Sequence, residues 1–449
     1  MVVECSFVDE VVLLSMQIKK KIQEQMEQIS DDIAEKVLQN PKLSDITQII
    51  KEEVLRLGTI LASTSLNHLV LKVSTESNIE GLKSKGKRER SLKTILGDIP
   101  YSRQAFYDSK NEKLCFPSDE AIGIQPGRLQ SDVLSACLKL AIEVPFHEAS
   151  SLYESLTGFS ISEGAIYDAT VEVGKCAELA NVIPSQEDLA KSVDLFSTQN
   201  PGEAVHLVLS IDGAHEPLRP EESKRKGARG DYYWKECKGF RLFAVARRGQ
   251  IAHLASWHQI CDAHTFGDSL QAVVPFIKER KEECVVVADG AKWIWGQVGE
   301  QLPENRVEIL DWYHAIEHLA EFADICFEKE KDKKNSWISK MKGYLMHDRL
   351  DSVVADIEQI AESKPKSNIL KCNLIGYIKN NEKRMQYGAF SARGLTIGSG
   401  GMEAANKSIC HNRLKKSGCW WKPSHANEML RLRCAKANGT LDDIIKKCW

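Results

Sequence analysis

Apolar and polar positions follow a helical period in the first part of the chain. Residues 10–72 carry apolar side chains at helical spacing, and Asn40-Pro41 interrupts the pattern. We therefore expect a first region, residues 1–80, built from two amphipathic helices. These helices could pack on the rest of the chain or mediate self-association.

A second region, residues 81–182, mixes short alternating stretches with helical ones. The basic run at 82–93 is interpreted as a linker or loop. Two alternating stretches around the polar turn at 108–113 predict a β-hairpin. A helix is expected from Leu129 to about Ile142.

Two further helical stretches in this region flank Gly158. One covers 147–156, and the other follows Ser162, which can cap it. A helix, a glycine turn and a capped helix are the outline of a helix-turn-helix unit. Simple packing of two helices has the same outline, so DNA contact is one of two interpretations.

After a connection at 183–201, the pattern changes to strands, and residues 203–449 are expected to form one domain. Three antiparallel strands, a helix, and two more strands separated by a helix are predicted. This order is the outline of a ribonuclease-H-like fold, a mixed five-stranded sheet flanked by helices. Residues 315–390 are helical throughout, and the fold class is α/β.

Composition restricts the class of protein. The chain of 449 residues is 43% hydrophobic and 27% charged, as in ordinary globular proteins. We find no run of about 18 apolar residues and no leader sequence, so we expect a cytoplasmic protein without a membrane segment. The 13 cysteines include no CxxC pair, which disfavours a disulfide framework or a zinc ribbon.

Basic residues are concentrated locally, although the net charge is −3. Residues 406–449 contain ten Lys and Arg against three Asp and Glu, and further basic runs lie at 82–93 and 222–229. Such asymmetry is typical of nucleic-acid binding, although each run could equally be a solvated face.

Three acidic residues are candidates for chemistry. Asp212 is expected to end the first strand of the sheet and Asp289 the fourth, while Glu403 follows a glycine-rich turn at which a helix can begin. In the predicted fold the first and fourth strands are neighbours, so Asp212 and Asp289 should lie side by side. A helix carrying Glu403 across that edge would complete a cluster.

Carboxylates in such a cluster suit phosphodiester chemistry. Two Mg²⁺ ions, roughly 3.5–4 Å apart, can activate a nucleophile and neutralise a leaving oxygen, and Mg²⁺ prefers oxygen ligands. We therefore expect Mg²⁺ or Mn²⁺ as the cofactor, with Asp212, Asp289 and Glu403 as catalytic residues and metal ligands.

Several motifs in order resemble those of ISKra-type insertion-sequence transposases, which are more distantly similar to mutator-like DDE enzymes. They are VLSIDGAHEP, VVVADGAKWIWG, EILDWYHAIEHL, IGSGGMEAANK and WKPSHANEMLRLRCAKANG. The resemblance implies that Asp212, Asp289 and Glu403 form the catalytic triad and that residues 315–390 are a helical insertion. It also makes Asp311 and His314 possible accessory residues, which could position DNA or a metal-bound water, or simply end a strand.

The basic C-terminal segment supplies candidate DNA contacts. Positively charged side chains can neutralise the DNA backbone, and tryptophans can stack on an unpaired base or fill the core. The residues are Lys407, Arg413, Lys415, Lys416, Trp420 and Trp421.

The resulting hypothesis is a homo-oligomeric transposase that binds terminal inverted repeats and target DNA and catalyses DNA strand cleavage and transfer. Two alternatives stay open, a transposase-derived DNA-binding protein without catalysis and a ribonuclease-H-like nuclease. No GxGxxG follows a predicted strand, which disfavours a dinucleotide-dependent enzyme.

Overall fold

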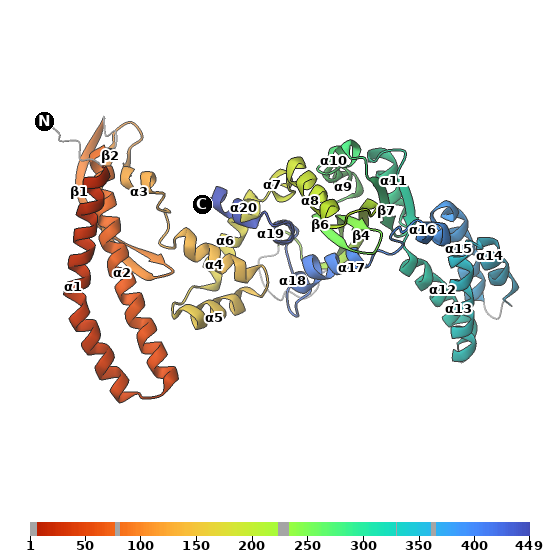
Figure 1. Cartoon of the computed structure of the whole chain (residues 1–449), viewed down its shortest axis with the longest axis horizontal. Coiled ribbons are helices and arrows are strands. Elements are labelled where there is room, and N and C mark those ends of the chain that lie inside the picture. The colour runs from red at the N-terminus through yellow and green to blue at the C-terminus, as the bar shows by residue number, and fades with distance from the viewer. Residues whose placement is uncertain (1–6, 77–80, 223–232, 329, 361–364) are drawn as a thin grey trace. The chain divides into compact units, whose positions relative to one another are not determined.

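The computed structural model describes residues 7–76, 81–222, 233–328, 330–360 and 365–449 (Figure 1). Two compact units are present. Unit 1 comprises Met1–Ala141, Phe146–Ile166 and Trp449, and unit 2 comprises Ile142–Pro145 and Tyr167–Cys448. The predicted N-terminal helices and the predicted hairpin therefore share one unit. Residues 223–229 of the third basic run lie outside the described part of the chain.

Two long helices begin unit 1, α1 (Phe7–Gln39) and α2 (Leu43–Glu76), and the break at Asn40-Pro41 is confirmed. Their contact includes a buried carboxylate, because Glu53 is 3% exposed and pairs with Lys36 at 2.8 Å. Arg56 adds a second ion pair to Glu53 at 3.1 Å.

Helix α2 bears on the expectation that the chain has no membrane segment. In the described part of the chain, its stretch Leu43–Val73 is the one segment long and apolar enough to cross a membrane by length and composition, with a mean hydropathy of 1.3. In the structure α2 packs on a β-strand as well as on α1, since the Ser102 amide donates to Asn67 Oδ1 at 2.9 Å.

The strands of unit 1 form a three-stranded antiparallel sheet in the order β1-β2-β3. They are β1 (Leu82–Thr94), β2 (Gly97–Asp108) and β3 (Lys113–Cys115). The hairpin around 108–113 is confirmed, but the interpretation of 82–93 as a linker is wrong, because this run forms β1. Its charged side chains are tolerated because β1 is an edge strand and residues 83–89 are exposed.

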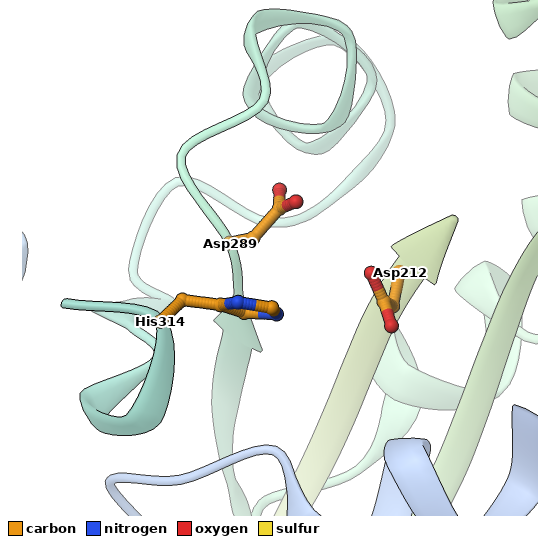
Figure 2. A group of neighbouring side chains, drawn as sticks. All are labelled: Asp212, Asp289 and His314. Atoms are coloured by element: carbon orange, nitrogen blue, oxygen red, sulfur yellow. The ribbon is translucent and has the colours of Figure 1, made fainter. Parts of the chain in front are cut away.

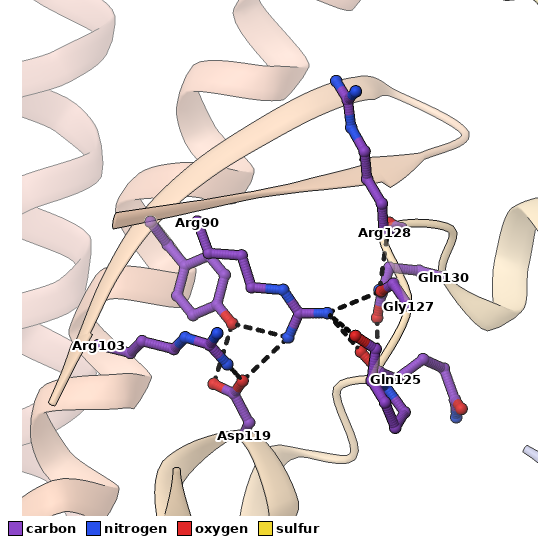
Figure 3. A network of polar contacts seen from close by, with 9 residues as sticks. Arg90, Arg103, Asp119, Gln125, Gly127, Arg128 and Gln130 are labelled. Carbon is purple, nitrogen blue, oxygen red and sulfur yellow. Dashed lines mark hydrogen bonds and ion pairs between the residues drawn. The ribbon is translucent and has the colours of Figure 1, made fainter. Parts of the chain in front are cut away.

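A buried ion network organises the loop after β3 (Figure 3). Helix α3 (Pro117–Ile122) carries Asp119, which accepts hydrogen bonds from Tyr101 at 2.9 Å and from Arg90 at 3.0 Å, and which also pairs with Arg103. The second terminal nitrogen of the Arg90 guanidinium, Nη2, donates to the carbonyl oxygens of residues 125–127. One strand residue thereby fixes the chain that leads into helix α4 (Ser131–Ala141).

The two helices of the predicted helix-turn-helix outline are present as α5 (Phe146–Thr157) and α6 (Glu163–Cys176). Gly158 between them has a φ of +83°, which favours glycine. The division between the units falls within α6, and DNA contact by this pair stays a prediction.

The stretch predicted as a connection at 183–201 is instead mostly helix α8 (Gln186–Gln199), which follows the short α7 (Leu179–Val182). Ser185 caps α8 by accepting the Asp188 amide at 3.1 Å. Leu189, Val193 and Phe196 bury one face of it. The helical spacing of these three residues was a signal that the polar composition of the segment concealed.

Unit 2 contains the five-stranded mixed sheet, in the order β6-β5-β4-β7-β8. The pairs β6-β5 and β5-β4 are antiparallel, while β4-β7 and β7-β8 are parallel. The strands are β4 (Val205–Leu218), β5 (Tyr233–Ala246), β6 (Ile251–Gln259), β7 (Glu283–Ala288) and β8 (Val307–Leu310). The mixed α/β class with a five-stranded mixed sheet is therefore confirmed.

Helices cover both faces of this sheet. On one face Phe266 of α9 meets Phe240 of β5, with ring centroids 6.4 Å apart. On the other face, the Arg241 side chain donates to the Gly401 carbonyl of α17 at 2.7 Å. Besides α7, α8 and the helices between β8 and α17, unit 2 contains α9 (Ala263–Leu270), α10 (Val274–Glu279), α11 (Lys292–Gln301), α17 (Gly400–Ala405), the π-helix η2 (Asn406–His411), α18 (Asn412–Leu414), α19 (Pro423–Asn438) and α20 (Leu441–Cys448).

A helical segment separates β8 from α17, as the pattern at 315–390 predicted. Its core includes Phe322, Met341 and Ile357, which are buried and belong to the same hydrophobic cluster as residues of the sheet. The elements are α12 (Trp312–Phe327), α13 (Lys331–Met346), α14 (Leu350–Gln359), α15 (Pro365–Asn380), the 3₁₀ turn η1 (Glu382–Arg384) and α16 (Tyr387–Ala392).

Candidate metal centre

Three neighbouring parallel strands each lead into an aspartate at the same edge of the sheet. Ile211 of β4 pairs with Ala288 of β7, and Ala288 pairs with Leu310 of β8. The next residues along these strands are Asp212, Asp289 and Asp311. Because parallel strands present their carboxyl ends at one edge, the register alone brings the three carboxylates together.

The side chains of Asp212, Asp289 and His314 form a cluster at this edge (Figure 2). Each offers one ligand atom, and these atoms lie within 4.8 Å of one another. Asp212 comes from β4, Asp289 follows β7, and His314 lies in the first turn of α12. The predicted juxtaposition of Asp212 and Asp289 is therefore present in the structure.

The carboxylates are held by backbone amides. The Gly213 amide donates to Asp212 Oδ1 at 2.7 Å, and the Ala291 amide donates to Asp289 Oδ1 at 2.8 Å. Within the described part of the chain, no Lys or Arg forms an ion pair with Asp212 or Asp289. The local negative charge is thus opposed mainly by His314.

The electrostatics of the cluster reflect this crowding. Burial and the nearby charge of Asp289 raise the pKa of Asp212 to about 6, against a smaller opposite effect of the Gly213 amide. Burial lowers the pKa of His314, but the carboxylates of Asp311, Asp212 and Asp289 and the bond to Glu317 outweigh it and leave that pKa above its usual value. A bound cation would relieve the repulsion between the two carboxylates.

The donor set fits a divalent cation. Two carboxylate oxygens suit Mg²⁺ and Mn²⁺, whereas an imidazole nitrogen is a ligand of the softer transition metals. The presence of His314 in the cluster therefore favours Mn²⁺ over Mg²⁺ as a probe of the site. Asp212 and Asp289 would hold the cation from two strands, and His314 from α12.

The placement of Asp212 corrects the prediction that it ends the first strand. Strand β4 continues to Leu218, because residues 213–218 still pair with β5. What ends at Ile211 is the pairing with β7. Asp212 is therefore fixed by a strand on one side and faces the open carboxyl end of β7 on the other.

Asp311 and His314, the possible accessory residues, have different roles. Asp311 is 1% exposed and caps α12, accepting the Tyr313 amide at 2.9 Å and the hydroxyl of Ser399. This bonding makes Asp311 the structural support for the turn that carries His314. His314 itself joins the cluster and contacts Glu317 at 3.1 Å.

Glu403 lies outside the cluster of Asp212, Asp289 and His314. It is exposed in the first turn of α17. Three residues later, Asn406 Nδ2 donates to Asp212 Oδ2 at 2.7 Å. Since three helical residues rise about 4.5 Å, Glu403 is within one turn of the contact to Asp212.

The predicted DNA contacts divide into exposed and buried residues. Lys407, Lys415 and Lys416 are exposed. Arg413 is 1% exposed and Trp421 is 8% exposed, and the Arg413 guanidinium lies 4.8 Å from the centre of the Trp421 ring. Arg413 is therefore buried, which differs from the expected surface contact, and Trp421 is buried as in the core-filling alternative for the tryptophans.

Trp420 instead belongs to an exposed aromatic group. Its ring meets that of Trp234 edge to face, with centroids 6.4 Å apart, and Trp234 is 57% exposed. Lys415 Nζ lies 5.7 Å from the centre of the Trp234 ring. We refer to Trp234, Trp420 and Lys415 as the aromatic surface. Sequence reasoning missed Trp234, for which the pair Tyr233-Trp234 at the start of a strand was the available signal.

Asn406 and His258 were also missed. The signal for Asn406 was its position one helical turn after Glu403. His258 gave no signal, because its relation to the cluster depends on strand pairing.

The fold and the site define a mixed α/β protein with an acidic cluster at the carboxyl edge of a five-stranded sheet. The family model for the uncharacterised protein family UPF0236 matches residues 36–196. The UPF0236 protein in vanSb 3'region of Streptococcus gallolyticus is 22% identical over 422 residues, which cover 91% of this chain and 86% of that protein. The similarity to that protein therefore extends over the carboxylate cluster, well beyond the segment that the family model matches.

Proposed function

We propose that this chain is a metal-dependent DNA-cleaving and strand-transferring enzyme of the DDE transposase type. The observation that carries the proposal is the juxtaposition of Asp212 and Asp289 at the ends of paired parallel strands, with His314 beside them. The resemblance of the surrounding motifs to those of ISKra-type transposases supports it.

The sheet supports the same proposal. Its order, with three antiparallel strands followed by two parallel ones, is the order expected for a ribonuclease-H-like domain. The helical segment between β8 and α17 accounts for the long separation of Asp289 and Glu403 in the sequence. The ribonuclease-H-like assignment is part of the proposal.

Within this proposal the protein's side chains hold and orient the reacting groups. Asp212 and Asp289 bind the cation, and His314 completes the set of ligands. A bound divalent cation supplies activation of a water or 3′-hydroxyl and neutralises charge on the phosphate. Glu403 lies one helical turn before Asn406, which contacts Asp212, and acts at the same edge of the sheet.

The aromatic surface and the exposed lysines provide a binding surface for DNA. Lys407, Lys415 and Lys416 neutralise phosphates, which is the part of DNA affinity that does not depend on sequence. Trp234 offers an exposed ring on which an unpaired base stacks. Trp420 supports that ring from its edge.

The test uses duplex DNA that carries the genomic sequence flanking this reading frame. Purified full-length protein with Mn²⁺ should nick this DNA near the terminal inverted repeats. Asp212→Asn, Asp289→Asn and Glu403→Gln should each abolish nicking while leaving DNA binding largely intact. Unchanged activity in a variant would remove that residue from the mechanism.

The alternatives predict different results in the same assay. A DNA-binding protein without catalysis would bind the flanking DNA and never nick it with Mn²⁺ or Mg²⁺. A ribonuclease-H-like nuclease would cleave RNA–DNA hybrids in preference to the flanking duplex. Either result would overturn the proposed strand transfer.

A further inference from the structure

Asp212 occupies one end of a row that crosses three strands. In the sheet register Asp212 pairs with Gly239 of β5, and Gly239 pairs with His258 of β6. Residues that pair directly across strands point to the same face of a sheet. Asp212 and His258 therefore stand on one face with a glycine between them.

Gly239 has no side chain, and the His258 ring occupies the space that a side chain at this position would need. A Cβ atom at Gly239 would lie 2.4 Å from His258 Cδ2, far inside van der Waals contact. The His258 ring thus lies against the bare backbone of β5 and leans along the row toward Asp212.

Asn406 joins the two ends of this row. Its Nδ2 donates to Asp212 Oδ2 at 2.7 Å, and its Oδ1 lies 3.0 Å from His258 Nε2. Asn406 is 4% exposed and His258 is 0% exposed, so solvent does not compete for these bonds. Asn406 also begins the π-helical turn η2, a type of turn that is frequent at functional sites.

The direction of each hydrogen bond follows from the chemistry of the groups. The Asn406 amide nitrogen can only donate, so its oxygen must accept from His258. His258 therefore carries its proton on Nε2, and its Nδ1 faces Cys434 Sγ at 3.9 Å. Burial lowers the pKa of His258 to about 4, which is consistent with a neutral ring that has this one tautomer.

We propose that Asn406 and His258 are positioning residues that orient the Asp212 carboxylate for cation binding and fix the rotation of the helix that carries Glu403. This inference rests on the proposed function. The bond from Asn406 fixes Oδ2 of Asp212, while the Gly213 amide fixes Oδ1. With both oxygens fixed, the carboxylate plane is set before a cation arrives. Residues that orient metal ligands in this way raise metal affinity.

The experiment is a calorimetric titration of full-length protein with Mn²⁺, combined with thermal unfolding of each variant in EDTA. Asn406→Ala should weaken Mn²⁺ binding by about 10- to 100-fold, the range for loss of a group that orients a ligand. His258→Leu should weaken it similarly. His258→Gln should restore much of the affinity, because the Gln Nε2 can donate to Asn406 in place of the imidazole.

Asn438 provides the matched control. It is a second asparagine that bridges to β6, accepting from the Ser256 amide at 2.8 Å and lying 3.1 Å from His253 Nε2. It makes no contact with Asp212 among the bonds described. Asn438→Ala should lower the unfolding temperature as much as Asn406→Ala and leave Mn²⁺ affinity unchanged.

The possible failures can be told apart. If the wild-type protein binds no Mn²⁺, or if Asp289→Asn binds it equally well, the proposed metal site itself is contradicted. If the wild-type protein binds Mn²⁺ and Asp289→Asn does not, but Asn406→Ala binds normally, only the positioning role is overturned. Equal loss of affinity in Asn438→Ala would also overturn it, since general destabilisation would then explain the effect.

Discussion

Carboxylates of low solvent exposure are neutralised in opposite ways in the two units of this protein. In unit 1, Asp119 is 6% exposed and is bonded to Arg90, Arg103 and Tyr101, so its charge is balanced within the fold (Figure 3). In unit 2, Asp212 and Asp289 lie near one another, and within the described part of the chain their negative charge is balanced mainly by His314 (Figure 2). The first arrangement is complete within the fold, whereas in the second we propose that a cation from outside supplies the balancing charge.

Glu216 represents a third arrangement. It is 0% exposed, and burial raises its pKa to about 7. Its partner in the ion pairs described is His411, at 3.4 Å, and burial lowers the pKa of that histidine. Below about pH 7, a proton on the carboxyl rather than an arginine or a metal keeps Glu216 neutral inside the protein.

The largest expected effect is on the Asp119 network. Asp119→Asn should lower the free energy of unfolding of unit 1 by about 3–5 kcal/mol, because it leaves two half-buried guanidinium groups without their counter-charge. Urea denaturation measures this loss. The control is Asp98→Asn, whose ion pair with Arg128 is exposed and should contribute less than about 1 kcal/mol. Equal effects of the two variants would contradict the contrast between internal and external neutralisation.

Cation binding gives the next largest effect. Mn²⁺ at about 100 times its dissociation constant should stabilise unit 2 by about 2.7 kcal/mol. Differential scanning calorimetry with and without EDTA detects the shift. Asp289→Asn should remove the shift, and Asp119→Asn should retain it in unit 2. A shift that survives in Asp289→Asn would mean that Mn²⁺ binds elsewhere.

The prediction for Glu216 depends on pH. The folded state keeps the proton on Glu216 up to about pH 7, whereas the unfolded chain loses it near the ordinary pKa of 4.5. The free energy of unfolding should therefore fall between these pH values and stay low above them. Glu216→Gln, which stays neutral, should stabilise the protein by about 2 kcal/mol at pH 8 and by little at pH 4.5. Destabilisation at pH 8 would instead mean that nearby charge, such as that of Lys415, stabilises the ionised Glu216.

The smallest effect concerns the metal-free cluster. Asp289→Asn should raise the stability of unit 2 in EDTA by about 1 kcal/mol, because it removes a like charge beside Asp212 and keeps the acceptor for the Ala291 amide. Chemical denaturation in EDTA tests this. A decrease would mean that the two carboxylates do not repel one another in the free protein.

The sequence predicted these regions unequally. The strands of unit 2 and the meeting of Asp212 with Asp289 were predictable, because continuous apolar runs indicated the strands and the strand order of the expected fold made the first and fourth strands neighbours. Strand β1 was missed because its residues are charged, which an edge strand allows. Helix α8 was missed because its polar residues concealed the spacing of Leu189, Val193 and Phe196.

Several residues of the site could likewise not be predicted from local sequence patterns. His314 enters the cluster because the cap at Asp311 aims the first turn of α12, and this direction depends on the contact with Ser399. His258 reaches Asn406 because Gly239, its neighbour on β5, has no side chain that would collide with the His258 ring. Such relations arise from strand register and helix placement, which no local pattern records.

Anomalous diffraction from crystals of the full-length protein soaked with Mn²⁺ tests directly whether the cluster of Asp212, Asp289 and His314 binds a metal ion. We expect a manganese peak within coordination distance of Asp212 and Asp289, with His314 as a further ligand. Such a peak should be absent from crystals of Asp289→Asn treated in the same way. A wild-type crystal with no peak at this edge of the sheet, or with manganese bound only at other residues, would contradict the proposed metal site.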